Sequence, residues 1–240
     1  MRLLLALAFF LAAVAHVCAQ DEGSPKAQVL TESFLAAHPD VKYRMEGLTA
    51  LDQGQPERAY LAFRRASTFA DKASQAMVGD MLWTGNGTAE DRVMAYVWMD
   101  LAAERGYTMF ISKREKYWAQ LSSEQQARAK LDGLAVYDEF GDAAAKPRLE
   151  RKLDRARRKI TGSRTGFVGA LKIMIPGPGG WTTINGDTYY ADHYWKPKDY
   201  FAWQDKVWSA PPTGVVDIGP MSTEPGASES KDEPTQDGSH

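Results

Sequence analysis

The stretch AMVGDMLWTGNGTAEDRVMAYVWMDLAAERGY, residues 76–107, determines the fold of this 240-residue chain. Apolar residues recur at helical spacing on both sides of a loop that contains Gly85 and Gly87. Thr88 and Asp91 lie three positions apart before the second apolar run, as in a pair that caps a helix N-terminus. The stretch therefore predicts two antiparallel helices, joined by a loop in which the glycines permit positive φ.

A related unit precedes this stretch. Gly47 corresponds to Gly79, once a loop four residues shorter is allowed in the earlier unit. The spacing of the other matches is 36 residues, just above the length of about 34 residues that is typical of tetratricopeptide repeats. Paired helices with short turns predict an α-helical repeat array. The matching residues are Ala59, Phe63 and Ala66, which recur as Ala95, Met99 and Ala102.

Helical spacing and start signals extend over residues 31–140. We expect Asp40 to cap a helix that ends near residue 51, and Pro56 to occupy the first position of the next helix. Ser123 with Gln126 is expected to start the last helix of the array. Further helices are expected at about 72–83, after the Thr88/Asp91 pair and ending near residue 106, at 109–121 and at 124–140. The last two are predicted to cap the array.

Residues 76–107 resemble the Sel-1-like repeats, which are relatives of tetratricopeptide repeats. The unit at about 43–75 lacks the long G-x-G loop and departs from that pattern, and residues 108–240 lie outside the resemblance. The resemblance implies a helical repeat fold and protein–protein interaction. We interpret the matching positions as packing and turn residues rather than ligand contacts. They are Ala76, Gly79, Gly85, Gly87, Asp91, Ala95, Trp98, Ala102, Ala103 and Gly106.

The N-terminus has the pattern of a secretory signal peptide. Arg2 precedes thirteen apolar residues, 3–15, a run too short to span a membrane. We predict cleavage after Ala19, which would remove Cys18 and leave a thiol-free chain that is periplasmic or secreted. The net charge of −2 argues against a polycation that coats nucleic acid. Residues 20–30 are expected to be a flexible lead-in.

Basic residues gather in a predicted amphipathic helix at 141–163. Nine basic and two acidic side chains between residues 146 and 164 give a local net charge of +7. Two interpretations stay open: a site for an anionic partner, with Arg151, Arg155 and Arg158 as candidate contacts, or a solvated helix face. The anionic partner could be an envelope polyanion, phospholipid headgroups or an acidic protein. The tail at 210–240, predicted to be disordered and acidic, could neutralise part of this charge.

Residues 164–209 predict a small Gly- and aromatic-rich module that contains β-structure. The Asn185–Gly186 pair indicates a tight hairpin. Eight of the twenty residues from 189 to 208 are aromatic. Trp195 and Trp203 are candidate binding residues if the rings are exposed, whereas buried rings would form the core of the module. The module is similar to the C-terminal part of exported Sel-1-like proteins, which implies no activity.

The chain carries no catalytic motif that we can identify, and we predict no cofactor and no metal site. We therefore expect a mainly α protein, a Sel-1-like array of paired helices with a small C-terminal module. Its expected function is that of an exported, non-catalytic scaffold that binds a protein partner in the bacterial cell envelope through its helical repeat surface. One alternative is binding of cell-wall glycan through Trp195 and Trp203. A cell-wall hydrolase is the less favoured alternative.

Overall fold

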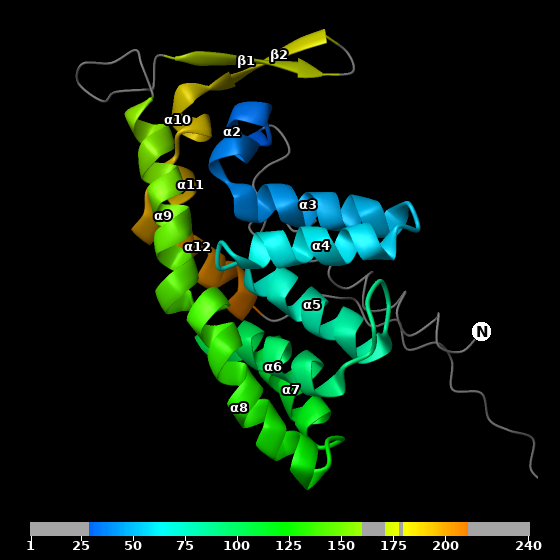
Figure 1. Ribbon diagram of the computed structural model, residues 1–240. Coiled ribbons are helices and arrows are strands. Elements are labelled where there is room, and N and C mark those ends of the chain that lie inside the picture. Colours follow the sequence, from blue (N-terminus) through cyan, green and yellow to red (C-terminus); the bar gives the residue numbers. More distant parts are fainter. Residues whose placement is uncertain (1–28, 160–170, 178–179, 211–240) are drawn as a thin grey trace, which may run out of the picture.

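The computed structural model describes residues 29–159, 171–177 and 180–210 (Figure 1). Within these residues the protein is mainly α-helical, as expected, with one two-stranded sheet. The predicted signal peptide with Cys18, residues 20–28 of the lead-in and residues 211–240 of the tail lie outside the described residues. No helix in the described part of the chain is long and apolar enough to span a membrane.

Two helix pairs form the repeat. Helix α3 (Pro39–Asp52) packs on α4 (Pro56–Ser67), and α5 (Lys72–Thr84) packs on α6 (Arg92–Ala102). A glycine at the same position of each pair allows the helices to approach closely. The predicted repeat is therefore confirmed in the packing.

The glycine contacts show how close this approach is. A Cβ atom on Gly79 would lie 3.0 Å from the carbonyl oxygen of Ala95 and 3.2 Å from the backbone nitrogen of Met99. A Cβ atom on Gly47 would lie 2.6 Å from the ring of Phe63. Helix α5 therefore packs backbone against backbone on α6, whereas the earlier pair accommodates an aromatic ring.

The loop between α5 and α6 has the expected conformation. Gly85 has φ +67° and Gly87 has φ +75°, and a Cβ atom on Gly87 would lie 2.3 Å from the carbonyl oxygen of Pro56. Asp91 caps α6, because its side chain accepts a hydrogen bond from the backbone N–H of Met94 at 3.0 Å. Thr88 lies in the loop and takes no part in this cap.

Two predicted caps are wrong in detail. The residue before α3 is His38, and Asp40 lies inside the first turn, where it is buried rather than capping. Ser122 and Gln125 form the capping box of α8 (Ser123–Phe140), one residue earlier than expected for Ser123 and Gln126. The first deviation arises because Pro39 suits the first helical position, so α3 begins before Asp40. Residue preference does not separate the two adjacent Ser/Gln pairs, since both consist of the same residue types.

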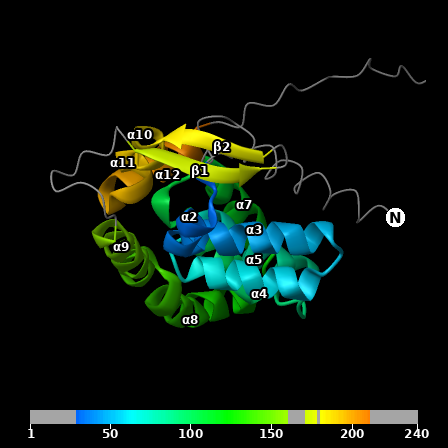
Figure 2. The same cartoon turned by 90° about the horizontal axis from the view of Figure 1, so that it is seen from above.

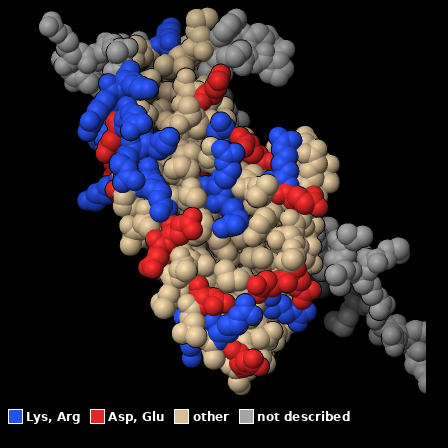
Figure 3. Space-filling view, viewed as in Figure 1, with Lys and Arg blue, Asp and Glu red and all other residues tan. Residues whose placement is uncertain are grey.

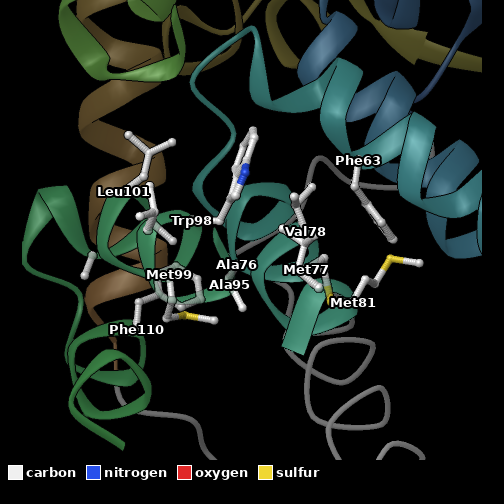
Figure 4. Packing of buried hydrophobic residues seen from close by; sticks show 14 of the residues in the cluster. Phe63, Ala76, Met77, Val78, Met81, Ala95, Trp98, Met99, Leu101 and Phe110 are labelled. Atoms are coloured by element: carbon white, nitrogen blue, oxygen red, sulfur yellow. The ribbon is translucent and has the colours of Figure 1, made fainter. Parts of the chain in front are cut away.

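Helix α7 (Thr108–Trp118) and α8 pack on α6, as expected of elements that cap the array. The main hydrophobic core lies between α4, α5 and α6 and extends to these two helices (Figure 4). Trp98 is buried with its ring centroid 4.7 Å from that of Phe140. Trp83 stacks on Tyr117 at 3.9 Å. Tryptophans thus pack between helices two apart in the chain, α5 with α7 and α6 with α8.

The C-terminal module contains both helices and strands. Strands β1 (Lys172–Gly177) and β2 (Gly180–Asn185) are antiparallel and pair from Lys172 with Asn185 to Gly177 with Gly180. The Asn185–Gly186 pair is therefore not the hairpin turn that we predicted. Its position follows from the pairing, because Asn185 ends β2 and the N–H of Gly186 donates to the carbonyl oxygen of Leu171.

Short helices follow the sheet and carry most of the aromatic residues. Gly186–Tyr189 forms α10, Asp192–Trp195 forms α11 and Pro197–Ser209 forms α12. The strands lie over the end of the molecule where α2 (Glu32–Ala37), α10 and α11 meet (Figure 2). The module is thus more helical than expected.

Helix α12 contacts the N-terminal ends of α3 and α7. The hydroxyl of Tyr200 donates a hydrogen bond to Asp40 in the first turn of α3. The ring centroid of Trp208 lies 5.9 Å from that of Phe110 in the first turn of α7. The C-terminal module is therefore an integral part of the repeat fold.

Candidate binding cleft along helix α9

Helix α9 (Asp142–Arg158) joins the array to the C-terminal module. Ala145, Leu149 and Leu153 on one face are fully buried, and they cluster with Tyr200 and Phe201 of α12. The apolar residues at these spacings give the amphipathic pattern that predicted the helix. This packing fixes α9 in position and directs its opposite face toward solvent.

Polar contacts anchor the first part of α9. Asp142 accepts hydrogen bonds from Arg105 at 2.7 and 2.9 Å, and the ammonium group of Lys72 lies 3.1 Å from it. Burial alone would raise the pKa of Asp142, but the hydrogen bonds and charge of Arg105, together with Lys72, hold that pKa well below its usual range. Lys72 also pairs with Glu104 at 2.6 Å. This network ties α9 to the repeat array.

Toward its C-terminal end α9 exposes a row of cations, which we call the basic face of α9. Its members make no salt bridge with any residue in the described ranges, whereas Arg157 pairs with Asp154 at 3.7 Å. The cations form the largest gathering of basic residues in the view of Figure 3. Uncompensated like charges at helical spacings of three and four residues destabilise a helix slightly. The basic face of α9 comprises Arg151, Lys152, Arg155, Arg158 and Lys159.

A cleft with a volume of about 520 Å³ lies between α9, α2 and the start of the C-terminal module. Lys152, Arg155 and Lys159 supply one side of it. The side formed by α2 carries small residues, and three aromatic residues of α10, α11 and the link between them complete the lining. The other lining residues are Ser33, Ala36, Ala37, Ala156, Tyr189, Tyr190 and Trp195.

The aromatic side of the cleft is held by hydrogen bonds and ring packing. The indole N–H of Trp195 donates to the carbonyl oxygen of Tyr189 at 2.5 Å, and the hydroxyl of Tyr189 lies 2.8 Å from that of Thr31. The ring of Tyr190 is 5.4 Å from that of Trp195 and remains partly exposed. Burial raises the pKa of both tyrosines, so both phenols are neutral at pH 7.

A second hollow of about 350 Å³ adjoins the cleft. Arg155 and Lys159 line both spaces, whereas Arg151, Arg158 and the acidic residue Asp154 line only the second. Arg155 is therefore the central cation of this surface. The arrangement can bind anions, since the cations that line both spaces make no salt bridge with any residue that the structure describes, and aromatic rings lie beside them in the cleft.

The structure brings together some of the residues proposed from the sequence. Arg151, Arg155 and Arg158 are exposed on one side of α9, and Arg155 and Trp195 both line the cleft. Trp195 is only 5% exposed, so its ring belongs to the core and is no open stacking platform. Trp203 is partly buried and packs between Tyr194 and Tyr200, at 5.4 and 5.7 Å, and it does not line the cleft.

Four charged or aromatic residues that line the cleft were missed as site candidates: Lys152, Lys159, Tyr189 and Tyr190. The spacing of three and four residues from Lys152 through Arg155 to Lys159 places them on one side of a helix, and this signal was present in the sequence. No comparable signal exists for Tyr190, because its position depends on how α10 and α11 pack against α2.

Other polar clusters in the described residues have structural roles. His38 is buried, with its ring nitrogens 2.8 and 2.6 Å from the carbonyl oxygens of Phe34 and Tyr194, so it links α2 to α11. Asp80 accepts hydrogen bonds from Lys113 and Tyr117 and thereby links α5 to α7. In the part of the chain that the structure describes, no group of three or more His, Cys, Asp or Glu residues could hold a metal ion.

Comparisons with known proteins are sparse. No family model matches the sequence, and no curated protein matches it. Among solved structures, the chain is similar to c5321, a protective antigen present in uropathogenic Escherichia coli strains that displays an SLR (Sel-1-like repeat) fold. The sequence identity is 21% and the TM-score is 0.40, and the match covers 52% of this chain. It spans 26% of the length of c5321.

Proposed function

We propose that this protein is an exported, non-catalytic scaffold that binds a protein partner in the bacterial cell envelope. The observation that carries the proposal is the basic face of α9, whose five cations have no ionic partner in the described part of the chain. Complementary charge on a partner gives specificity and speeds association. The partner should therefore present an acidic surface.

Buried contacts hold the basic face of α9 in one position before a partner binds. Leu149 and Leu153 are fully buried on the inner face of α9, and Asp142 is held by Arg105. A surface fixed before binding loses little conformational entropy when the partner arrives. Helical repeats serve this purpose well, because successive pairs stack into an extended and stable frame.

The alternatives receive less support from the geometry. Glycan binding through Trp195 would need an open ring face, and this ring is buried. A hydrolase would need acid and base groups facing a shared space. No carboxylate is among the described residues that line the cleft. Export rests on the sequence of residues 1–19, and it is tested by determining the N-terminus of the mature protein.

Affinity capture from cells tests the proposal. The full chain and a variant with Arg151→Glu, Arg155→Glu and Arg158→Glu are expressed with the same tag, and captured proteins are identified by mass spectrometry. A matched control reverses the same number of exposed charges elsewhere, with Arg58→Glu, Lys116→Glu and Lys130→Glu. We expect one or more acidic proteins to be lost from the α9 variant and retained by the control. Equal retention by both variants would refute the proposal.

A further inference from the structure

We infer that the cleft beside α9 binds an extended acidic polypeptide segment that also carries an apolar or aromatic side chain. The carboxylates of the segment contact Lys152, Arg155 and Lys159, and the apolar side chain lies on Tyr190. This inference rests on the proposed function, because the segment belongs to the acidic partner. It assigns the contact to a defined space of about 520 Å³, within the usual size range of ligand sites.

The spacing of the cations favours an extended chain as the ligand. Lys152 and Lys159 are seven residues apart, which corresponds to about 10 Å along a helix axis at roughly 1.5 Å per residue. An extended polypeptide covers this distance in about three residues at roughly 3.3 Å each. Because side chains alternate between the two faces of an extended segment, carboxylates two residues apart can reach the cations of α9, and the side chain between them faces away from α9. A single phosphate group would use only part of the row.

The opposite side of the cleft allows a backbone to come close. Ser33, Ala36 and Ala37 of α2 line it, and none has a long side chain. Ser33 and Ala36 are exposed, so this side is open to solvent. A polypeptide backbone can therefore lie between α2 and the cations of α9.

The aromatic side of the cleft favours a ligand that carries an apolar side chain. Tyr190 is partly exposed, and its ring is edge-on to Tyr189 at 4.8 Å and close to Trp195. Because Trp195 is fixed by its indole hydrogen bond, the rings are ordered before a ligand binds. Aromatic rings offer a large apolar surface, and the partly exposed ring of Tyr190 can pack against an apolar or aromatic side chain of the ligand. A segment with an apolar residue among its acids should therefore bind more tightly than a purely acidic one.

A peptide-binding experiment with the full chain tests the inference. The probe is a fluorescein-labelled Glu-Glu-Phe-Glu-Glu peptide, followed by fluorescence anisotropy. One control peptide has Gln in place of each Glu, and another has Ser in place of Phe. We expect each control peptide to bind at least about ten-fold more weakly than the probe, a difference of about 1.4 kcal/mol. Equal binding of the Ser-containing peptide would overturn the inference.

A variant that fills the cleft separates this inference from the proposed function. Ala36→Phe keeps every cation and places a ring in the cleft, and Ala127→Phe is a control at an exposed position of α8. We expect Ala36→Phe to weaken probe binding about ten-fold or more and the control to change it less than two-fold, roughly 0.4 kcal/mol. If Ala36→Phe binds the probe like the natural chain, the inference fails.

Two further results distinguish a polypeptide ligand from a membrane surface, and the cleft inference from the proposed function. Tight binding of the chain to vesicles of phosphatidylcholine and phosphatidylglycerol, unchanged by Ala36→Phe and exceeding probe binding, would overturn the inference in favour of a membrane surface. If the α9 triple variant loses the captured partner while Ala36→Phe retains it, the proposed function stands and the cleft inference fails. Loss of the partner with both variants supports the two together.

Discussion

The hydroxyl of Tyr200 in α12 donates a hydrogen bond to the carboxylate of Asp40 in α3, across 160 positions of sequence. Both side chains are fully buried, and Gln204 donates a second hydrogen bond to the same carboxylate oxygen at 3.1 Å. The contact joins the C-terminal module to the first helix pair. It explains why the module and the repeat array form one structure around α9.

Removing this contact should destabilise the whole fold. We expect Tyr200→Phe to lower the free energy of unfolding by about 1–2 kcal/mol, because the substitution leaves a buried carboxylate with one hydrogen bond fewer. Tyr43→Phe is the control, since the hydroxyl of Tyr43 bonds Arg65 at an exposed site. Urea denaturation followed by circular dichroism measures both. Equal stabilities of the two variants would contradict the structural role of Tyr200.

Substitution by alanine should change the free energy of unfolding in opposite directions at Gly79 and Gly133. Gly79→Ala would place a Cβ atom 3.0 Å from the carbonyl oxygen of Ala95, so we expect a loss of about 1–3 kcal/mol in the free energy of unfolding. A Cβ atom on Gly133 in α8 would lie 3.7 Å from Val97, which is an ordinary contact. Gly133→Ala should therefore gain about 0.5–1 kcal/mol through helix propensity. Thermal unfolding of both variants measures the difference, and a stable Gly79→Ala variant would refute the close packing of α5 on α6.

The network around Asp142 predicts a pH dependence of stability. The folded-state pKa of Asp142 is held below its usual range, because Arg105 and Lys72 outweigh the effect of burial. Its stabilising contribution is therefore complete above the unfolded pKa of about 3.9 and is lost as the pH falls toward the lower folded-state pKa. We expect Asp142→Asn to cost about 3 kcal/mol at pH 7 and progressively less as the pH falls below about 4.

Urea denaturation across this pH range measures the effect. Asp132→Asn is the control, because Asp132 forms an exposed i,i+4 pair with Arg128 at 3.1 Å. It should cost less than about 0.5 kcal/mol at any pH. A constant difference between the natural chain and Asp142→Asn down to about pH 2 would show that the carboxylate is not responsible.

The central cation of the basic face of α9 should matter for binding and not for folding. Arg155 has like-charged neighbours three and four residues away on both sides, namely Arg151, Lys152, Arg158 and Lys159. Their repulsion opposes the favourable position of a cation near a helix C-terminus. We expect Arg155→Gln to change the free energy of unfolding by less than about 0.5 kcal/mol and to weaken binding of the acidic probe about ten-fold. Denaturation and anisotropy on the same sample measure the two effects, and a large loss of stability would assign Arg155 to the fold.

Local signals in the sequence were sufficient for the repeat array. Asp91 and Pro56 specify helix ends through near neighbours, and the loop glycines have positive φ, so these signals can be recognised one unit at a time. The close approach of Gly87 to Pro56 of the preceding helix pair could not be recognised in this way. Asp40 could not be interpreted in this way, because its role depends on Tyr200 far along the chain. The Asn185–Gly186 pair was wrongly interpreted as a hairpin turn for a related reason. The pairing of Lys172 with Asn185 decides where the strands end, and it joins residues far apart in the sequence.

The candidate site was predictable only in part. The cations of α9 follow helical spacing and were visible in the sequence, whereas the cleft requires α2 and α10 to lie beside them. The aromatic residues of 189–208 were visible too, but their burial depends on the packing of short helices. A signal for α12 was present in the sequence but was not recognised. Pro197 suits a helix start, and Tyr200, Gln204 and Trp208 recur every four residues and are all buried.

Cross-linking of lysines in native cells, followed by mass spectrometry, is the most direct test of whether a partner protein binds the basic face of α9. We expect Lys152 and Lys159, on the basic face of α9, to form cross-links to lysines that flank an acidic segment of a partner protein. Lys42, Lys116 and Lys130 lie on other helices and serve as internal controls. Partner cross-links confined to these three lysines, with none from Lys152 or Lys159, would contradict the account.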